Sequence, residues 1–358
     1  MTLVRRNLRR LFPCLLTFVI IVLTLEAQSI WWDEGISLHL AGIPWRDLLA
    51  NRAANIHPPL YFVLLKGWLT LAGITPFSGR YLSALAVTLL PAATARFLAR
   101  RAGALSGRVV ALLVSVAPPF IVYGQEVRAY ALLPLGVLAL WSMTWPARGA
   151  RDDGQGPSSD HPLVLGTVLA ALALTHYVGV VAWAAAAGWV AIRAFRMTAR
   201  AARRRLLRRW AQGVGIAVSL VVPWVFFVVA AGLDRLGSQA GLANPTATPV
   251  PLRYVAAMLG LFHTTAQPGA FIDPALARSS ALVGLLLLVG VLAGLLRRSG
   301  RAALAASLFH WLVPFAAAPA IWALSPQSHP RYLYAFVVGG WITSALVVAR
   351  PVGRDRWQ

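Results

Sequence analysis

The sequence has few acidic residues and almost no cysteine. Its 358 residues include only 11 aspartates and glutamates, and charged residues make up 12% of the chain against 58% hydrophobic residues. This composition excludes an ordinary soluble domain, in which about a quarter of the residues are charged. The single cysteine, Cys14, allows neither a disulfide framework nor a thiolate metal site, so redox chemistry is not expected.

The hydrophobic residues form long runs. Each run approaches the roughly 20 residues that a helix needs to cross a bilayer. Run 162–192 is too long for one helix and is expected to form two spans with a turn at Thr175–His176. The pattern predicts an all-α polytopic membrane protein of about ten transmembrane helices. The runs are 11–25, 81–95, 109–123, 129–145, 162–192, 210–233, 279–296, 302–324 and 332–349.

The positions of the basic residues indicate the topology. A net charge of +22 would suggest nucleic-acid binding in a soluble protein. With the N-terminus inside, however, 24 of the 33 basic residues fall on one face and nine on the other, as the positive-inside rule requires. Both termini are then cytoplasmic. The basic cytoplasmic loop 193–209 is interpreted as a topology signal that contacts anionic membrane lipids, and no nucleic-acid partner is expected.

The chain is expected to form one transmembrane domain, 1–358, without a soluble C-terminal domain. Its long outer loops, 31–80 and 234–278, are where an external site could be built. The apolar piece 58–73 is expected to lie along the outer interface, because a full crossing there would invert every later loop.

The acids on the predicted outer face are candidates for chemistry. Asp33 and Glu34 follow the first span, and Glu126 ends the third, so the two loops can meet over one cavity. A carboxylate at a membrane surface calls for a cation, a metal or a proton, and Arg128 is one candidate partner of Glu126. Capping of the helix that follows Asp33 and Glu34 stays open as an alternative.

Other polar residues stand out by their place in the chain. Lys66 is the only lysine among 32 arginines, and its ammonium could reach a lipid phosphate from the interfacial segment. His57 precedes two prolines, His176 lies at the predicted turn, and His329 and Arg331 begin the last span. For each of these alone, packing or topology is the simpler explanation.

Several strings together carry a resemblance. WWDEGISL (31–38), HPPLYFVLLKGWLTLAG (57–73), GRYLSAL (79–85) and YGQEVRAYALL (123–133) follow one another in order, and THYVG (175–179) and HPRYLY (329–334) are weaker matches. They resemble the polyprenyl-phosphate-sugar-dependent glycosyltransferases of the protein mannosyltransferase and aminoarabinose transferase group, which have the GT-C fold. The resemblance implies a GT-C type bundle with an interfacial helical segment in the first outer loop.

It also implies an activity and a location. The protein would move a sugar from a polyprenyl-phosphate carrier to a glycan, lipid or protein acceptor, on the outer face of a bacterial inner membrane. Asp33 would be the catalytic base, with Glu34 and Glu126 as further catalytic acids. The implied donor-phosphate ligands are Lys66, Arg128 and Arg331, and the substrate-site candidates are His57, Tyr61, Tyr130, His176 and His329.

The chemistry of these groups agrees with that implication. A carboxylate such as Asp33 can accept the proton of an alcohol or amine acceptor, and cations can neutralise a departing polyprenyl phosphate without a proton. Asp33 and Glu126 could instead hold Mg²⁺ or Mn²⁺ on the phosphate, since hard oxygen ligands suit those ions. Metal use is left open.

Two other classes of function stay open. A transporter or flippase for lipid-linked saccharides would also need cations near lipid headgroups, although the sequence shows no inverted repeat. A non-catalytic scaffold of a cell-envelope complex would keep the fold without the chemistry. The presence of Asp33, Glu34, Lys66 and Glu126 argues against the scaffold.

Overall fold

The computed structural model describes residues 2–55, 57–145, 161–239, 282, 285–286, 289–296, 301–324 and 333–349, and these residues form helices and their connections, without a strand. The helices in chain order are α1 (Thr2–Leu23), α2 (Trp32–Gly42), α3 (Trp45–Ala54), α4 (Leu60–Ala72), α5 (Pro76–Ala102), α6 (Ala104–Ser115), α7 (Pro118–Tyr123), η1 (Ala129–Leu132), α8 (Leu133–Thr144), α9 (Pro162–Thr175), α10 (Gly179–Arg196), α11 (Arg200–Gln239), α14 (Arg301–Leu324) and α15 (Tyr334–Val348).

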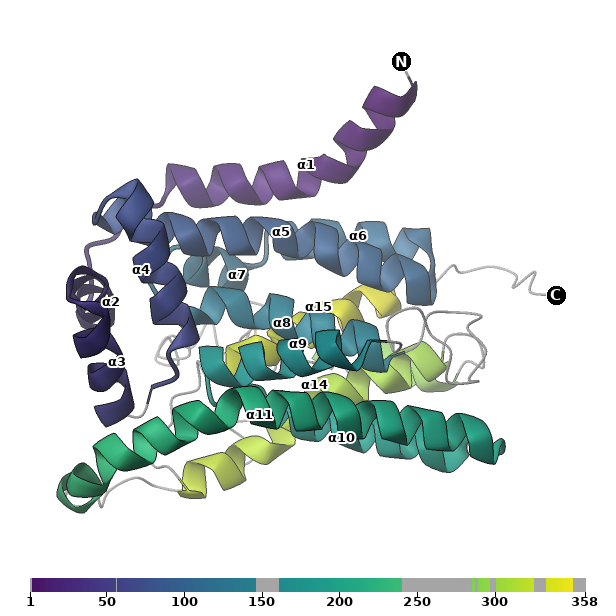
Figure 1. The fold of residues 1–358 in the computed structure, drawn as a ribbon. Helices are drawn as coiled ribbons and strands as arrows, with labels where there is room; N and C mark the ends of the chain where they lie inside the picture. The colour runs from purple at the N-terminus through teal and green to yellow at the C-terminus, as the bar shows by residue number, and fades with distance from the viewer. Residues whose placement is uncertain are drawn as a thin grey trace.

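The longer helices lie side by side in a bundle, with α2, α3 and α4 gathered at one end of it (Figure 1). The main core is apolar and aromatic, and its largest fully buried side chains include Trp141, Tyr334 and Phe120. A second cluster joins α2, α3 and α4 to the loop before η1 through Leu40, Leu48 and Val127. The end of the bundle is therefore a packed helical layer.

Two of the described helices, Pro76–Ala102 and Arg200–Ala231, are long and apolar enough to cross a bilayer by length and composition. The other apolar helices have 10–17 residues. Most described parts of the predicted hydrophobic runs are helical, but run 109–123 is divided at Val116 and Ala117 between α6 and the short helix α7, which starts at two prolines. The count of about ten crossings stays a prediction.

The predicted break within 162–192 is confirmed. Helix α9 ends at Thr175, His176 is extended with φ −160° and ψ 138°, and α10 begins at Gly179. Gly179 packs so closely on the preceding helix that a Cβ would collide with the carbonyl of Leu172. This close approach explains why a residue without a side chain stands at the turn.

The prediction of a loop at 193–209 is wrong for most of that segment. Helix α10 continues to Arg196, α11 starts at Arg200, and only 197–199 connect them. Alanine, leucine and arginine are strong helix formers, and Ala202 and Leu206 are buried in a cluster with Val190 of α10. Most of the arginines therefore lie on the first turns of α11.

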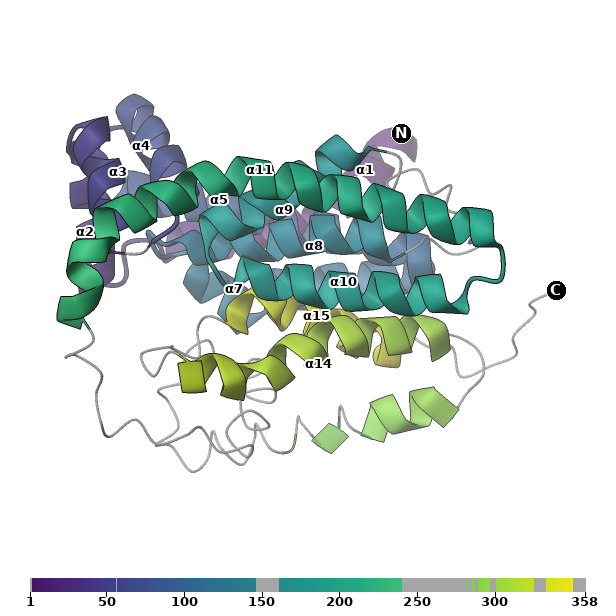
Figure 2. The same cartoon turned by 60° about the horizontal axis from the view of Figure 1, so that its bottom comes forward.

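The first residues of the predicted outer loop 234–278 are helical. Helix α11 continues through this segment to Gln239, and 240–278 lie outside the described residues. Helix α11 packs against α3, and Figure 2 shows α11 running along the bundle and reaching α2 and α3 at its end. One long helix thus connects the arginine-rich end to the layer of α2, α3 and α4.

The segment expected at the interface forms α4. In Figure 1, α4 runs across the direction of α1 and α5 and does not lie alongside them. Trp68 of α4 donates from Nε1 to the carbonyl of Ser78 at 2.7 Å, and Thr75 caps α5 by accepting the Ser78 N–H at 3.0 Å. These contacts fix α4 against the start of α5; its place at a membrane interface stays a prediction.

Candidate active site

A buried ion pair joins the first outer segment to helix α5. Arg80 Nε donates to Glu34 Oε1 at 2.8 Å, and Arg80 Nη2 donates to Glu34 Oε2 at 2.7 Å. Glu34 is fully buried and Arg80 is 3% exposed. Removing one partner of such a pair typically costs about 3–5 kcal/mol, because the other charge is left buried and unpaired.

The same pair organises the surrounding backbone. Arg80 also donates to the carbonyls of Leu25 and Gln28, at 2.8 and 2.9 Å. Glu34 accepts the N–H of Val127 at 3.0 Å and, at the start of α2, the N–H of Trp31 at 3.4 Å. The capping alternative therefore describes Glu34 in part, and the two loops that the sequence predicted to meet are joined at this carboxylate.

Asp33 has a different environment. Consecutive residues of a helix point about 100° apart, so the neighbour of buried Glu34 can face outward. The Asp33 side chain is 21% exposed, and its Oδ2 lies 3.4 Å from Arg128 Nη2, whose side chain is 13% exposed. Arg128, which the sequence suggested as a partner of Glu126, thus pairs with Asp33.

Arg52 of α3 adds a second cation beside this pair. It is 5% exposed, its Nη2 donates to Asn51 Oδ1 at 2.5 Å, and its guanidinium lies 4.6 Å from the centre of the Phe62 ring. Its Nε has no hydrogen-bond partner, and within the described segments no carboxylate pairs with it. Burial and, to a smaller extent, the nearby positive charge of Arg128 lower the pKa of Arg52 to about 10. At neutral pH the group stays charged.

His57 belongs to the same group of side chains. Its Nδ1 lies 2.7 Å from the carbonyl of Asn55, so Nδ1 carries the proton and Nε2 is left to accept. Burial lowers the pKa of His57; Arg52 and Arg128 lower it further, while the hydrogen bond to Asn55 and the charge of Asp33 oppose the shift. The imidazole is therefore neutral at pH 7 and lies within electrostatic reach of three charged groups.

The Lys66 side chain binds the end of helix α2. Its ammonium donates to the carbonyls of Ala41 and Ile43, at 2.9 and 2.6 Å, and lies 5.1 Å from the centre of the Trp45 ring. These carbonyls stand at the C-terminal end of α2, where a cation satisfies groups without a helical partner. The structure therefore places the Lys66 ammonium against the end of α2, and it makes no contact with Asp33 or Arg128 among the described interactions.

Glu126 and several aromatic residues lie next to the Asp33 loop. The Glu126 carbonyl accepts from Ser83 Oγ at 2.6 Å, which fixes the loop on α5. Burial raises the pKa of Tyr61 well above its usual value, and Arg128, Glu34 and Glu126 all lie close enough to influence it. Tyr61 is therefore within electrostatic reach of both acidic loops.

Tyr130 and His176 are brought together, with ring centres 5.7 Å apart, and Tyr130 packs on Tyr123 at 5.4 Å. Tyr123 in turn packs on Tyr334 at 4.2 Å. The hydroxyl of Tyr334 is buried and has no hydrogen-bond partner in the described part of the chain. His329 and Arg331, the remaining candidates, lie outside the described residues.

The alternative in which Asp33 and Glu126 hold a metal ion finds no further ligands among the described residues. Within the described ranges, no three or more His, Cys, Asp or Glu side chains gather in a group that could hold a metal ion. Asp33 is shared with the guanidinium of Arg128, a cation that competes for the same carboxylate.

Sequence reasoning missed Arg52 and the role of Arg80. A charge within an apolar segment calls for a partner, so Arg80, at the start of an apolar run, could have been matched to one of the few outer acids. Nothing in the sequence around Arg52 distinguishes it from Arg46 in the same helix. Only the packing of α3 on Phe62 and next to Arg128 singles it out.

Comparison with known proteins supports the fold. No protein-family model matches the sequence, and no curated protein matches it. The oligosaccharyltransferase of Archaeoglobus fulgidus, in its apo form, is similar in structure with a TM-score of 0.53 and 11% identity, over 95% of this chain and 50% of that one. The archaeal oligosaccharyltransferase AglB from the same organism, in complex with an inhibitory peptide and a dolichol-phosphate, gives 0.51 and 11%, over 95% and 49%.

ArnT from Cupriavidus metallidurans, in the apo state, has a TM-score of 0.45 and 17% identity, over 92% of this chain and 75% of that one. The chain spans about half the length of the oligosaccharyltransferase chains it matches. At 11% identity the likeness concerns the fold alone. The described residues thus have an oligosaccharyltransferase-like helical fold, which supports the expected GT-C type bundle without naming a subfamily.

Proposed function

We propose that this protein is an integral membrane glycosyltransferase that moves a sugar from a polyprenyl-phosphate carrier to an acceptor. The observation that carries the proposal is the partly exposed carboxylate of Asp33 paired with Arg128, whose charge in turn acts on the buried Arg52, a cation without a carboxylate partner among the described residues. The fold is shared with an oligosaccharyltransferase that was solved with a dolichol-phosphate. Membrane lipids surround the protein in this proposal, and nucleic acid has no part in it.

Asp33 is the proposed base. The hydroxyl or amine of the acceptor gives its proton to the Asp33 carboxylate as the acceptor atom bonds to the first carbon of the sugar. The bond between that carbon and the phosphate oxygen breaks, and both electrons leave with the polyprenyl phosphate. One direct displacement of this kind inverts the configuration of the sugar carbon. Arg128 orients Asp33 through the 3.4 Å ion pair.

The leaving phosphate gains negative charge and needs cations that are already in place. Arg52 and Arg128 can supply them, since a guanidinium forms strong charge-assisted hydrogen bonds to phosphate oxygens. Lys66 is assigned a structural role because its ammonium is held by two carbonyls. Arg331 stays a proposed phosphate ligand from outside the described residues.

The other acids and aromatic residues take supporting roles. Glu34 is a positioning residue, since its carboxylate is buried and bonded to Arg80. Glu126 stays a proposed catalytic acid next to Tyr61, and the substrate-site candidates Tyr61, Tyr130, His57, His176 and His329 would contact the sugar or acceptor. The hydroxyl of Tyr61 is buried and lies near Ser83 and the charges of Glu34, Glu126 and Arg128, and in this proposal it would hydrogen-bond a sugar hydroxyl.

The proposed location follows from the basic residues. The first turns of α11 carry the arginine cluster, which belongs on the cytoplasmic side under the positive-inside rule. The layer of α2, α3 and α4 lies at the opposite end of α11 (Figures 1 and 2). The active site would therefore open on the outer face of the inner membrane of a bacterium, with both termini cytoplasmic.

The test is transfer of labelled sugar from a panel of polyprenyl-phosphate sugars to membrane acceptors. The intact protein is compared at matched expression with Asp33→Asn and with Asp47→Asn, an exposed acid of α3 in the same outer segment. Loss of a general base lowers rates by about 10²–10⁴-fold. The proposal expects that loss for Asp33→Asn alone.

Equal product from the Asp33→Asn protein would remove Asp33 from the mechanism and direct attention to Glu126. If no donor gives product and a deletion strain accumulates lipid-linked sugar on the wrong leaflet, the flippase is the better interpretation. A requirement for added Mg²⁺ or Mn²⁺ would revive the metal alternative.

A further inference from the structure

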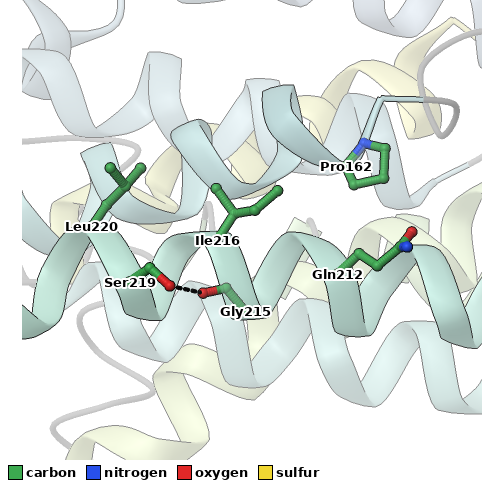
Figure 3. A pocket seen from close by; sticks show the side chains of 6 residues that line it. All are labelled: Pro162, Gln212, Gly215, Ile216, Ser219 and Leu220. Carbon is green, nitrogen blue, oxygen red and sulfur yellow. Dashed lines mark hydrogen bonds between the residues drawn. The ribbon is translucent and has the colours of Figure 1, made fainter.

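A groove of about 520 Å³ lies where the start of α9 meets α11, away from the residues proposed for catalysis. It is lined by Pro162 of α9 and, on α11, by Gln212, Gly215, Ile216, Ser219 and Leu220 (Figure 3). The part Arg200–Ala231 of α11 is long and apolar enough to cross a membrane, and only 11% of its most apolar stretch is buried inside the protein. The groove therefore faces the surface that lipid would cover.

Glycines shape the groove. A Cβ on Gly213 would lie 2.6 Å from Leu165 Cδ2, and one on Gly166 would lie 2.6 Å from Ile216 Cβ, so α9 and α11 pack in close contact. Gly215, in contrast, does not pack closely against a neighbouring helix, since a Cβ there would meet nothing within 4 Å. The hollow beside the close contact is left open because no side chain projects from 215.

The polar groups along the groove follow one face of α11. Arg208, Gln212, Gly215 and Ser219 are spaced i, i+4, i+7 and i+11, which places them in one stripe. Arg208 and Gln212 are exposed, and Ser219 Oγ donates to the Gly215 carbonyl at 2.9 Å, as Figure 3 shows. The stripe passes from a cation to an amide and then to an apolar hollow, in the order of a lipid headgroup, glycerol and acyl chain.

The basic residues near the stripe favour a negatively charged ligand. The sequence has no aspartate or glutamate between Asp160 and Asp234, while eight arginines lie between 193 and 209. The stretch 161–233, which includes α9, α10 and most of α11, therefore carries positive charge without a carboxylate of its own, and juxtamembrane arginines are attracted to anionic lipid headgroups.

We propose that this groove is a binding site for an anionic phospholipid, with its phosphate on Arg208, its ester region at Gln212 and an acyl chain along Gly215 and Leu220. The site is separate from the proposed sugar transfer and does not depend on it. It differs from general lipid contact because it requires Arg208 on one face of α11 and a residue without a side chain at position 215.

The experiment counts lipids that stay bound to the full-length protein, purified in detergent, by native mass spectrometry. Phosphatidylglycerol and phosphatidylcholine with identical acyl chains are added at equal concentrations. Arg208→Gln is compared with Arg203→Gln, an exposed arginine that lies about 140° away around the same helix. Gly215→Leu fills the hollow, with Gly215→Ala as the smaller control.

We expect the protein to retain phosphatidylglycerol in preference to phosphatidylcholine. Arg208→Gln should abolish the preference while Arg203→Gln keeps it, and Gly215→Leu should reduce retention of both lipids. Inorganic phosphate should not compete, since it has no acyl chain. Equal retention of the two lipids, equal effects of the two arginine variants, or full retention by Gly215→Leu would each overturn the proposal and leave only general lipid contact.

Discussion

The carboxylate of Glu34 and the guanidinium of Arg80 meet through hydrogen bonds of 2.8 and 2.7 Å in a place closed to solvent, one residue away from the partly exposed Asp33. Adjacent acids in the chain thus have separate tasks. Glu34 holds the start of α2 against α5 and the Val127 loop, and Asp33 is left partly accessible beside Arg128. Precise placement of a reactive group of this kind calls for a supporting shell that does not move.

Breaking the Glu34–Arg80 ion pair should lower the stability of the folded protein. Arg80→Gln leaves the Glu34 carboxylate buried without its cation, so we expect the free energy of unfolding to fall by about 3–5 kcal/mol. Thermal unfolding of the purified protein in detergent measures the change. Arg46→Gln, which removes an exposed arginine of α3, is the control and should unfold like the parent. An Arg80→Gln protein as stable as the parent would contradict the structural role of the pair.

Lys66→Met should act on stability and leave donor binding almost unchanged. The ammonium satisfies two carbonyls at the end of α2, and hydrogen bonds to a charged group are worth about 1.5–3 kcal/mol each. The Tm should therefore fall while the Kd for polyprenyl phosphate, measured in the same detergent, stays near the parent value. The reverse pattern, weaker binding at an unchanged Tm, would return Lys66 to the phosphate site that the sequence suggested.

Arg52→Gln should show the opposite combination. The variant removes a buried cation that has no carboxylate partner in the described residues, so the Tm should not fall. Binding of polyprenyl phosphate should weaken by about 10–100-fold, the equivalent of a charge-assisted hydrogen bond of about 1.5–3 kcal/mol. Arg46→Gln again serves as the matched control. If both variants bind polyprenyl phosphate equally well, Arg52 does not contact the carrier.

His57 should make stability depend on pH in the acid range. Burial lowers the pKa of His57 in the folded protein below its ordinary value of 6.5, so between these two pKa values the unfolded chain binds more protons than the folded one. Stability is therefore retained above pH 6.5 and lost as the pH falls toward the folded pKa. We expect the Tm of His57→Gln to fall less steeply between pH 7 and 5 than that of the parent. The exposed His39→Gln should keep the parent slope, and a His57→Gln slope equal to it would rule out the buried neutral imidazole.

The long apolar runs predicted the helices well because membrane-crossing helices are marked by composition along 20 residues. The Thr175–His176 break was visible for the same reason, as a polar pair within an apolar run. The meeting of the Asp33 and Glu126 loops was also predicted, because both were expected to follow spans that end on one face. These features depend on local sequence and on topology.

The roles of individual side chains could not be predicted in the same way. Asp33 and Glu34 look alike in the sequence, and only the turn of α2 sends one inward to Arg80 and leaves the other outside. Lys66 looked like a phosphate ligand because it is the only lysine, but its partners are backbone carbonyls, which no sequence pattern marks. Arg52 became visible only once the packing of α3 placed it beside Arg128.

Helix α11 has 40 residues, which at 1.5 Å per residue gives a length of about 60 Å. A bilayer has a hydrocarbon thickness of about 30 Å, so the helix is about twice as long as the layer it would cross. One end carries the arginines that would rest among headgroups, and the other packs on α3, the helix of Arg52. The apolar run of α11, 210–233, is about 36 Å long at the same rise, slightly more than the hydrocarbon layer. Hydrophobic mismatch would then tilt a helix that is coupled to the site at its far end, which makes membrane thickness itself an input to the geometry around Asp33.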